Sequence, residues 1–395
     1  APEFDALLPY WLGAWAIQLG EGWLAPHVAV RVPFIGLLLL TLAATWYAVY
    51  QLARTPGAQP VAFAFGGEAD PRDYARAMAD AGLLALIACL GLAQLSHETT
   101  PALAQLAFTA LAFYGLAGLP ATRPWPPLAL LAGLLGLTLS GAPTLAVLFA
   151  LGGAGVLLLR LREDAGDPAL ARGIRWWAAG VVGGALAAAV LAELLDLWHW
   201  RVDAGLLEAR SAIRLLAWFT WPAWPLALWT LWRWRRQLGS RHVALPLWVA
   251  GVSVASALTT HNADRSLLLA LPALAALAAF ALPTLRRSVA ALIDWFTLLF
   301  FSVGALVIWT VWLAMETGWP AQPARNVARS APEFVHSFAW PALLVAVAAT
   351  LAWLGLVRWR TRSHRQALWK SLVLPAAGTT LGWLLLMTLW LPLLD

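Results

Sequence analysis

Long apolar segments recur along the whole chain, and short polar segments rich in arginine separate them. About twenty apolar residues in a helix are enough to cross the roughly 30 Å hydrocarbon core of a bilayer. The pattern predicts twelve such helices, with the fourth and fifth short enough to form a re-entrant hairpin instead. Their expected ranges are 32–51, 74–95, 101–119, 127–140, 143–159, 174–195, 213–232, 242–260, 266–285, 291–314, 337–357 and 369–391.

The composition supports a membrane protein. Hydrophobic residues make up 61% of the chain and charged residues only 12%, which excludes an ordinary water-soluble globular domain. We therefore expect an all-α polytopic helix bundle, with residues 1–30 as an outer juxtamembrane segment and 31–395 as a single transmembrane domain. Cys89 is the only cysteine, so an intrachain disulfide is impossible.

The basic residues indicate how the bundle is oriented. Nineteen of the 26 arginine and lysine residues fall on one side of the predicted helices, and the positive-inside rule assigns that side to the cytoplasm. Because the number of predicted helices is even, both ends of the chain are expected outside. The arginines lie in short loops at helix ends, so they indicate topology rather than nucleic-acid binding. The seven basic residues on the other, outer side are Arg31, Arg201, Arg210, Arg214, Arg265, Arg325 and Arg329.

Most tryptophans lie near predicted helix ends, where an interfacial aromatic belt is expected. Trp218, Trp221 and Trp224 differ, because they crowd one predicted helix end together with Pro222 and Pro225. Proline kinks helices, and a kink there is expected to open a groove. This cluster is the best aromatic candidate for a ligand-binding wall.

The outer segments hold nearly all the polar residues that topology does not explain. Arginine binds phosphate through paired hydrogen bonds, and a carboxylate can act as a general base, so this combination suits an anionic lipid-linked substrate. Simpler interpretations remain open: Glu98 as a solvated or helix-capping residue, Asp264 with Arg265 as a local ion pair, and His261 as a structural residue. For Arg201 and Arg210 the wet face of a surface helix is the favoured simpler interpretation.

Three motifs resemble those of a known family. The run YWLGAWAIQLG at 10–20, followed by AVRVPF at 29–34, is similar to the N-terminal region of bacterial GT-C glycosyltransferases. LTLSGAP at 137–143 resembles their Leu-Thr-Lys-Gly-Pro turn, with Ser140 where lysine is common. DRSLLLALPAL at 264–274 resembles their arginine-led helix entry. The nearest groups are the aminoarabinose transferases and the wider dolichyl-phosphate-mannose-protein mannosyltransferase-like family.

The resemblance implies which residues act. Family members have an additional spanning helix at their N-terminal side and a soluble C-terminal tail, so this chain is expected to be a piece without them. The family's leading acidic residue follows that helix and has no counterpart here. Glu98 is then the best candidate for the catalytic carboxylate, with Asp5 or Glu3 at the second acidic position. The expected substrate-binding residues are Arg265, Asp264, His261, Arg201, Arg210, His97 and Ser140.

The implied activity is transfer of a sugar from a polyprenyl-phosphate donor to a lipid, glycan or protein acceptor, with inversion by in-line attack. It would take place on the periplasmic face of a bacterial inner membrane, with membrane lipids as partners and no nucleic acid. No metal and no other cofactor is expected, because a phosphate leaving group does not require a metal. A transporter or flippase and a non-catalytic scaffold remain the alternatives. A transporter would favour charges at mid-membrane, and the sequence offers only Asp294, near the cytoplasmic end of its predicted helix, and Glu193.

Overall fold

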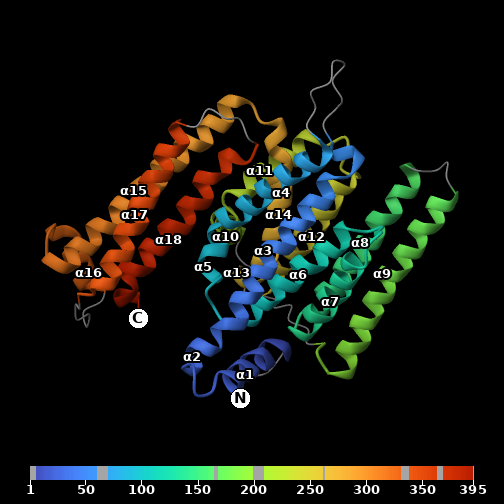
Figure 1. Cartoon of the computed structure of the whole chain (residues 1–395), viewed down its shortest axis with the longest axis horizontal. Helices are drawn as coiled ribbons and strands as arrows, with labels where there is room; N and C mark the ends of the chain where they lie inside the picture. Colours follow the sequence, from blue (N-terminus) through green and yellow to red (C-terminus); the bar gives the residue numbers. More distant parts are fainter. Residues whose placement is uncertain are drawn as a thin grey trace. The chain divides into compact units, whose positions relative to one another are not determined.

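The computed structural model describes residues 6–59, 70–163, 168–198, 209–260, 263–330, 338–362 and 368–394. In these ranges the regular structure is helical, which confirms the all-α expectation (Figure 1). The chain forms two compact units, Ala1–Thr284 and Leu285–Asp395, which are described separately. The predicted division into a segment 1–30 and a domain 31–395 stays a prediction.

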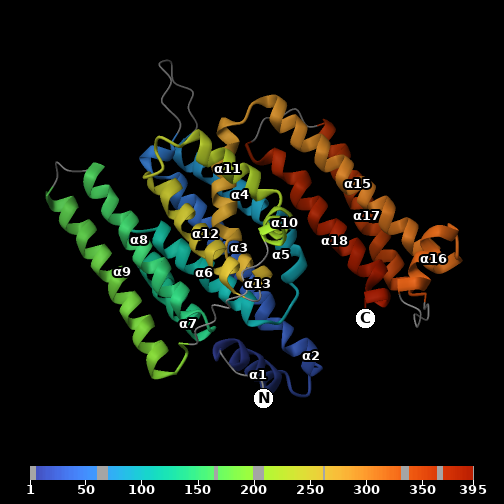
Figure 2. The same ribbon diagram turned by 180° about the vertical axis from the view of Figure 1, so that it is seen from behind.

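The first unit contains α1 to α14. In Figures 1 and 2, α8 and α9 lie side by side at its margin, and the two helices pack against each other. The bounds are α1 Leu8–Gly20, α2 Pro26–Ala29, α3 Arg31–Ala53, η1 Pro56–Ala58, α4 Pro71–Ala88, α5 Leu90–Leu95, α6 Pro101–Ala117, α7 Trp125–Leu139, α8 Pro143–Glu163, α9 Pro168–Leu194, α10 Ala209–Phe219, α11 Ala223–Arg233, α12 Arg241–Thr259, α13 Ala263–Leu268, α14 Leu271–Ala281 and η2 Leu282–Thr284.

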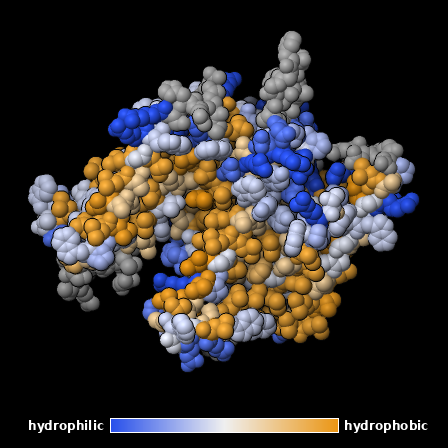
Figure 3. All heavy atoms as spheres, viewed as in Figure 1, coloured by the Kyte–Doolittle hydropathy of each residue, from blue (hydrophilic) through white to orange (hydrophobic). Residues whose placement is uncertain are grey.

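The chain is a multi-pass membrane protein. Within the described residues, seven helices are long and apolar enough to span a bilayer, and three shorter apolar helices accompany them. Figure 3 shows hydrophobic residues covering the middle of the first unit's helices and hydrophilic residues gathered toward their ends. We call these ends the arginine-rich end, predicted to face the cytoplasm, and the arginine-poor end.

The described structure differs from the predicted helices at three places. The expected helix 74–95 is divided at Cys89, whose backbone is extended, into α4 and α5. The expected helix 213–232 is divided before Pro222 into α10 and α11, and the expected helix 266–285 before Pro272 into α13 and α14. Proline lacks the N–H that continues a helix but fits its first turn, which explains the second and third interruptions.

The interruptions in two of these helices meet inside the bundle. The backbone N–H of Leu90, at the start of α5, donates to the carbonyl oxygen of Trp221 at 3.1 Å. Gly91 lies directly against the ring of Phe219, so α5 and α10 approach closely. On one side of the interruptions α5, α10 and α13 contact one another, and on the other side α4 and α11 both pack on α14. Non-helical backbone at this depth is tolerated because protein groups surround it.

Tryptophan side chains link neighbouring helices through their indole N–H groups. Trp46 on α3 donates to Asp80 Oδ1 on α4 at 2.9 Å, and Trp248 on α12 donates to the carbonyl oxygen of Leu148 on α8 at 2.9 Å. Each bond satisfies a polar group that lipid could not satisfy. These tryptophans therefore fasten helices together, a role beyond the interfacial anchoring expected from the sequence.

The second unit consists of long helices fastened in the same way. Trp309 on α15 donates to Thr350 Oγ1 on α17 at 3.0 Å, and Trp353 on α17 donates to Ser302 Oγ on α15 at 3.1 Å. Its helices α15 and α17 both pack against α18. The bounds are α15 Arg287–Thr317, α16 Ala321–Ser330, α17 Trp340–Arg362, η3 Leu368–Leu372 and α18 Val373–Leu394.

Asp294, named in the sequence as a charge that a transporter would favour, lies near the start of α15 and is paired within the second unit. Its Oδ2 accepts a hydrogen bond from Nη2 of Arg360 on α17, and the two side chains are only 19% and 22% exposed. An acidic side chain in a membrane helix is expected to pair with a cation or to face water. The ion pair supplies a structural reason for Asp294, because it joins α15 to α17.

Replacing Gly91 with alanine is expected to destabilise the first unit by about 1–3 kcal/mol, because the added methyl group overlaps the Phe219 ring. Gly251→Ala is the matched control, since nothing lies within 4 Å of a methyl group at that helical position. There alanine should be neutral or stabilising. Thermal unfolding of the purified protein measures both, and equal stability of the two variants would contradict the close approach of α5 and α10.

Arg360→Gln is expected to lower the stability by more than about 1 kcal/mol, because it leaves Asp294 charged and half-buried without its partner. The double variant Asp294→Asn with Arg360→Gln should recover part of that loss. Arg358→Gln, on the same helix but exposed, is the control. If Arg360→Gln and Arg358→Gln unfold at the same temperature, the Asp294–Arg360 pair contributes no more to stability than an exposed arginine does.

Candidate functional site

The candidate site lies at the arginine-poor end of the first unit, where the short helices α5, α10 and α13 contact one another. Helix α1 reaches this end as well, because the backbone N–H of Leu7 donates to the carbonyl oxygen of Leu139, the last residue of α7, at 2.8 Å. The connections at this end are short and carry polar side chains. The interrupted helices thus bring several of these polar connections close together at the arginine-poor end.

Glu98 and Arg265 form the central contact. Glu98 lies in the turn between α5 and α6, and its Oε2 accepts from Nη2 of Arg265 on α13 at 3.3 Å. The side chains are 30% and 44% exposed, respectively, so an incoming ligand can reach both. An accessible pair of this kind contributes only about 0–1 kcal/mol to stability. The structure thus brings together two residues that the sequence singled out separately.

Hydrogen bonds at the start of α13 hold Arg265 in place. Asp264 Oδ1 accepts from the backbone N–H of Arg265 at 2.9 Å. The hydroxyl groups of Thr260 and Ser266 share a hydrogen bond of 2.9 Å, which joins the end of α12 to α13. In the described part of the chain, the Arg265 guanidinium pairs with Glu98 rather than with Asp264. Asp264 orients the backbone, and Arg265 points its charge toward the α5–α6 turn.

A cavity of about 350 Å³ adjoins this arrangement, and we call it the outer cavity. Ser266, the residue after Arg265, is part of its wall. The wall combines hydroxyl and amide groups with small apolar residues, which suits a ligand with many hydroxyl groups. The lining residues are Gln105, Gly141, Ala142, Pro143, Thr144, Leu145, Leu148, Val252, Ala255, Ser256, Thr259, Thr260 and Ser266.

Ser140, predicted to bind substrate, is buried beside this cavity. Its carbonyl oxygen accepts from Gln105 Nε2 at 2.7 Å, and its hydroxyl group has no partner among the described residues. The next residue, Gly141, has a φ of +85°, a conformation that glycine adopts easily. Ser140 therefore acts on the cavity through its backbone, because it fixes the amide of Gln105 in the wall.

The other predicted residues are less closely connected. His97 is exposed and immediately precedes Glu98, and Arg210 is exposed near the start of α10. These positions are compatible with a ligand that extends beyond the outer cavity. Four predicted residues lie outside the described residues, namely Glu3, Asp5, Arg201 and His261.

An apolar cavity of about 430 Å³ lies between α1 and the start of α3. Trp15 and Leu19 of α1 and Val32 of α3 contribute to its wall. Its lining is almost wholly apolar, so it suits a hydrocarbon chain rather than a polar group. The arginine-poor end of the first unit therefore carries one polar and one apolar cavity.

The sequence interpretation missed the polar residues of the outer cavity. Gln105 is the single amide in the mostly apolar helix α6, and Ser256, Thr259 and Thr260 lie within one turn of each other at the end of α12. A polar side chain in a membrane helix is costly, which makes it a functional candidate by default. That rule would have singled out Gln105 as a functional candidate, although not the wall to which it belongs.

Among the described residues, no three His, Cys, Asp or Glu side chains are grouped to hold a metal ion. The expectation that no metal is required stays a prediction.

No protein-family model and no curated protein sequence matches the chain. Two solved structures share its fold: ArnT from Cupriavidus metallidurans in the apo state, and the same protein bound to undecaprenyl phosphate. The apo structure has a TM-score of 0.58 and 15% identity, over 98% of this chain and 66% of that chain. The bound structure has a TM-score of 0.57 and 16% identity, over 97% and 66%.

The chain thus has the polytopic helical fold of ArnT, and the resemblance drawn from its motifs is confirmed at the level of the fold. It spans 66% of the length of those ArnT structures. At this level of identity the likeness establishes the fold, and the activity follows only as a proposal.

Cysteine labelling tests the position and orientation of the outer cavity. The native Cys89 is fully buried, so background labelling should be low. Thr144→Cys, exposed in the cavity wall, should react with a membrane-impermeant thiol reagent added on the periplasmic side, whereas Gln237→Cys at the arginine-rich end should react only after the membrane is opened. The reverse pattern would contradict the predicted orientation.

Proposed function

We propose that this chain belongs to a glycosyltransferase of the bacterial inner membrane that moves a sugar from a polyprenyl-phosphate donor to an envelope acceptor on the periplasmic face. The observation that carries the proposal is the contact between Glu98 and Arg265 beside the outer cavity. The ArnT fold supports it, because one of the similar structures is bound to undecaprenyl phosphate.

In the proposed reaction the acceptor oxygen or nitrogen attacks the anomeric carbon of the sugar in line with the leaving group. The bond between that carbon and the donor phosphate oxygen breaks, and polyprenyl phosphate leaves. Glu98 takes the proton of the acceptor as general base, and the Arg265 guanidinium stabilises the charge that develops on the phosphate. In-line attack inverts the configuration at the anomeric carbon.

The geometry leaves both groups available for these roles. Only one oxygen of Glu98 and one nitrogen of Arg265 take part in their contact, and its length of 3.3 Å is beyond the normal range for such a bond. A guanidinium carries five N–H donors, so Arg265 can bind phosphate while it still orients Glu98. The exposure of both side chains allows the pair to separate when substrate enters.

The two cavities at this end match the two parts of the donor. The hydroxyl-lined outer cavity suits the sugar, and the apolar cavity between α1 and α3 suits the isoprenoid chain. Asp264, His97, Arg210 and Ser140 are proposed to support binding of the donor and acceptor. Glu3, Asp5, Arg201 and His261 belong to the proposal through the family resemblance.

The test measures transfer of radiolabelled sugar from polyprenyl phosphate in membranes that contain the full-length protein. Glu98→Gln should lower the rate by about 10²–10⁴-fold because the general base is lost. Arg265→Ala should lower it by about 10²–10³-fold because phosphate stabilisation is lost. Glu193→Gln, an exposed carboxylate near the end of α9, is the matched control and should leave transfer unchanged.

The outcomes separate the site from the activity. Because the Glu98–Arg265 pair is accessible to solvent and contributes little to stability, both variants should be present in the membrane at normal levels. Unchanged transfer in both variants would remove these residues from the site while leaving the activity in place. If the wild-type protein transfers sugar to no lipid, glycan or protein acceptor, transport or a scaffold role would replace the proposal.

A further inference from the structure

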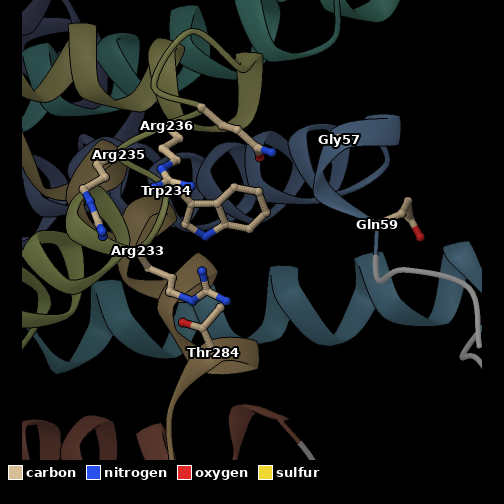
Figure 4. A pocket seen from close by; sticks show the side chains of 8 residues that line it. Gly57, Gln59, Arg233, Trp234, Arg235, Arg236 and Thr284 are labelled. Atoms are coloured by element: carbon tan, nitrogen blue, oxygen red, sulfur yellow. The ribbon is translucent and has the colours of Figure 1, made fainter.

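The arginine-rich end of the first unit contains a cavity that the proposed transfer reaction does not use. Its volume is about 540 Å³. Arg233 ends α11, and Arg235 and Arg236 follow in the connection to α12. Three separate parts of the chain supply the wall: this arginine-containing segment, Thr284 at the end of η2, and Gln59. Figure 4 shows the three arginines grouped around the indole of Trp234.

The positive charge of this cavity is not neutralised by the described protein. Neither Arg233 nor Arg236 has an ion pair or a side-chain hydrogen bond with any described residue. Arg235 donates only to the carbonyl oxygen of Trp232 at 3.0 Å, and its guanidinium lies over the Trp232 ring. Like charges held in one hollow repel each other, so an anion that enters it is stabilised by all three.

The nearby carboxylates on α4, which contacts α11, already have partners. Asp70 accepts from the backbone N–H of Arg72, Asp73 pairs with Arg76 at 3.1 Å, and Asp80 accepts from Trp46. Their printed partners lie on α4 itself or on α3. No described carboxylate pairs with Arg233 or Arg236, so the cavity can take an anion from outside the described residues.

The surroundings favour a lipid over a free anion. On α11, Leu228 and Trp232 are one turn apart and are 56% and 57% exposed, so they form an apolar strip that faces the hydrocarbon. The strip ends next to Arg233, the last residue of the helix, and Trp232 lies under the guanidinium of Arg235 in the connection that follows. Acyl chains can follow the strip while the headgroup phosphate reaches the cavity, as basic pockets between membrane helices bind anionic headgroups.

We propose that this cavity binds the phosphate headgroup of an anionic phospholipid in the leaflet at the arginine-rich end, with Arg233 and Arg236 as its main ligands. Guanidinium groups hold a phosphodiester through paired charge-assisted hydrogen bonds, and the Trp232 ring supports the adjacent acyl chain. The site is independent of the transfer reaction and lies at the opposite end of the same helices.

Native mass spectrometry of the detergent-solubilised full chain tests this site. Phosphatidylglycerol and phosphatidylcholine with identical acyl chains are titrated, so that the probes differ mainly in net charge. The wild-type protein should retain phosphatidylglycerol in preference to phosphatidylcholine. The double variant Arg233→Gln with Arg236→Gln should weaken phosphatidylglycerol binding by about tenfold or more, because two charge-assisted contacts are lost, and should leave phosphatidylcholine binding unchanged.

The matched control removes the same number of charges elsewhere at this end. Arg172→Gln with Arg175→Gln changes two exposed arginines of α9 and should preserve the lipid preference. If both double variants lose phosphatidylglycerol binding equally, the lipid is attracted by the overall positive charge of this end, and the proposed site is overturned. Displacement of the lipid by millimolar inorganic phosphate would overturn the lipid assignment. If the protein with Arg233→Gln and Arg236→Gln elutes differently from the wild type, the single variant Arg236→Gln provides the same comparison.

Discussion

The rest of this structure depends on one constraint: a polar group surrounded by hydrocarbon must find its partner inside the protein. An uninterrupted helix meets this requirement by itself, but three helices of the first unit are divided. In two of them the interruptions satisfy each other, because the Leu90 N–H donates a hydrogen bond to the Trp221 carbonyl oxygen. Once the backbone groups at these interruptions are satisfied, the two halves of each helix can take different directions, and Glu98 and Arg265 can meet.

The tryptophans show how the same constraint is met between helices. Association of helices in lipid gains little from hydrophobic burial, so directional bonds and close packing decide which faces meet. The indole combines a large apolar ring with one donor, and in both units that donor bonds to a neighbouring helix. Hydroxyl groups without such a neighbour, as in Thr41 and Thr45, bond back to carbonyls of their own helix.

The sequence predicts the helical fold well because hydrophobic length is set by the bilayer. Helix α3, for example, extends only a residue or two beyond the range expected from its apolar run. The interruption at Cys89 was not predictable in this way, since an apolar run carries no mark of extended backbone at its centre. The Glu98–Arg265 contact joins residues 167 positions apart and depends on how α5 and α13 are packed, which composition and spacing do not encode. Gln105 was visible as an isolated amide but could be assigned to the wall only once Ser140 was placed.

The division of the helices also has a consequence for motion. Helices α5 and α13 contain six residues each, too few to be stable without packing, because forming the first turn of a helix is costly. They are expected to open locally at a lower free energy than the long helices on which they rest. Arg265 and Ser266 belong to one of these segments, so a ligand that engages them also orders the segment that presents them. Affinity at this end then depends on the cost of that ordering, and amide hydrogen exchange in α13 would slow when the ligand is bound.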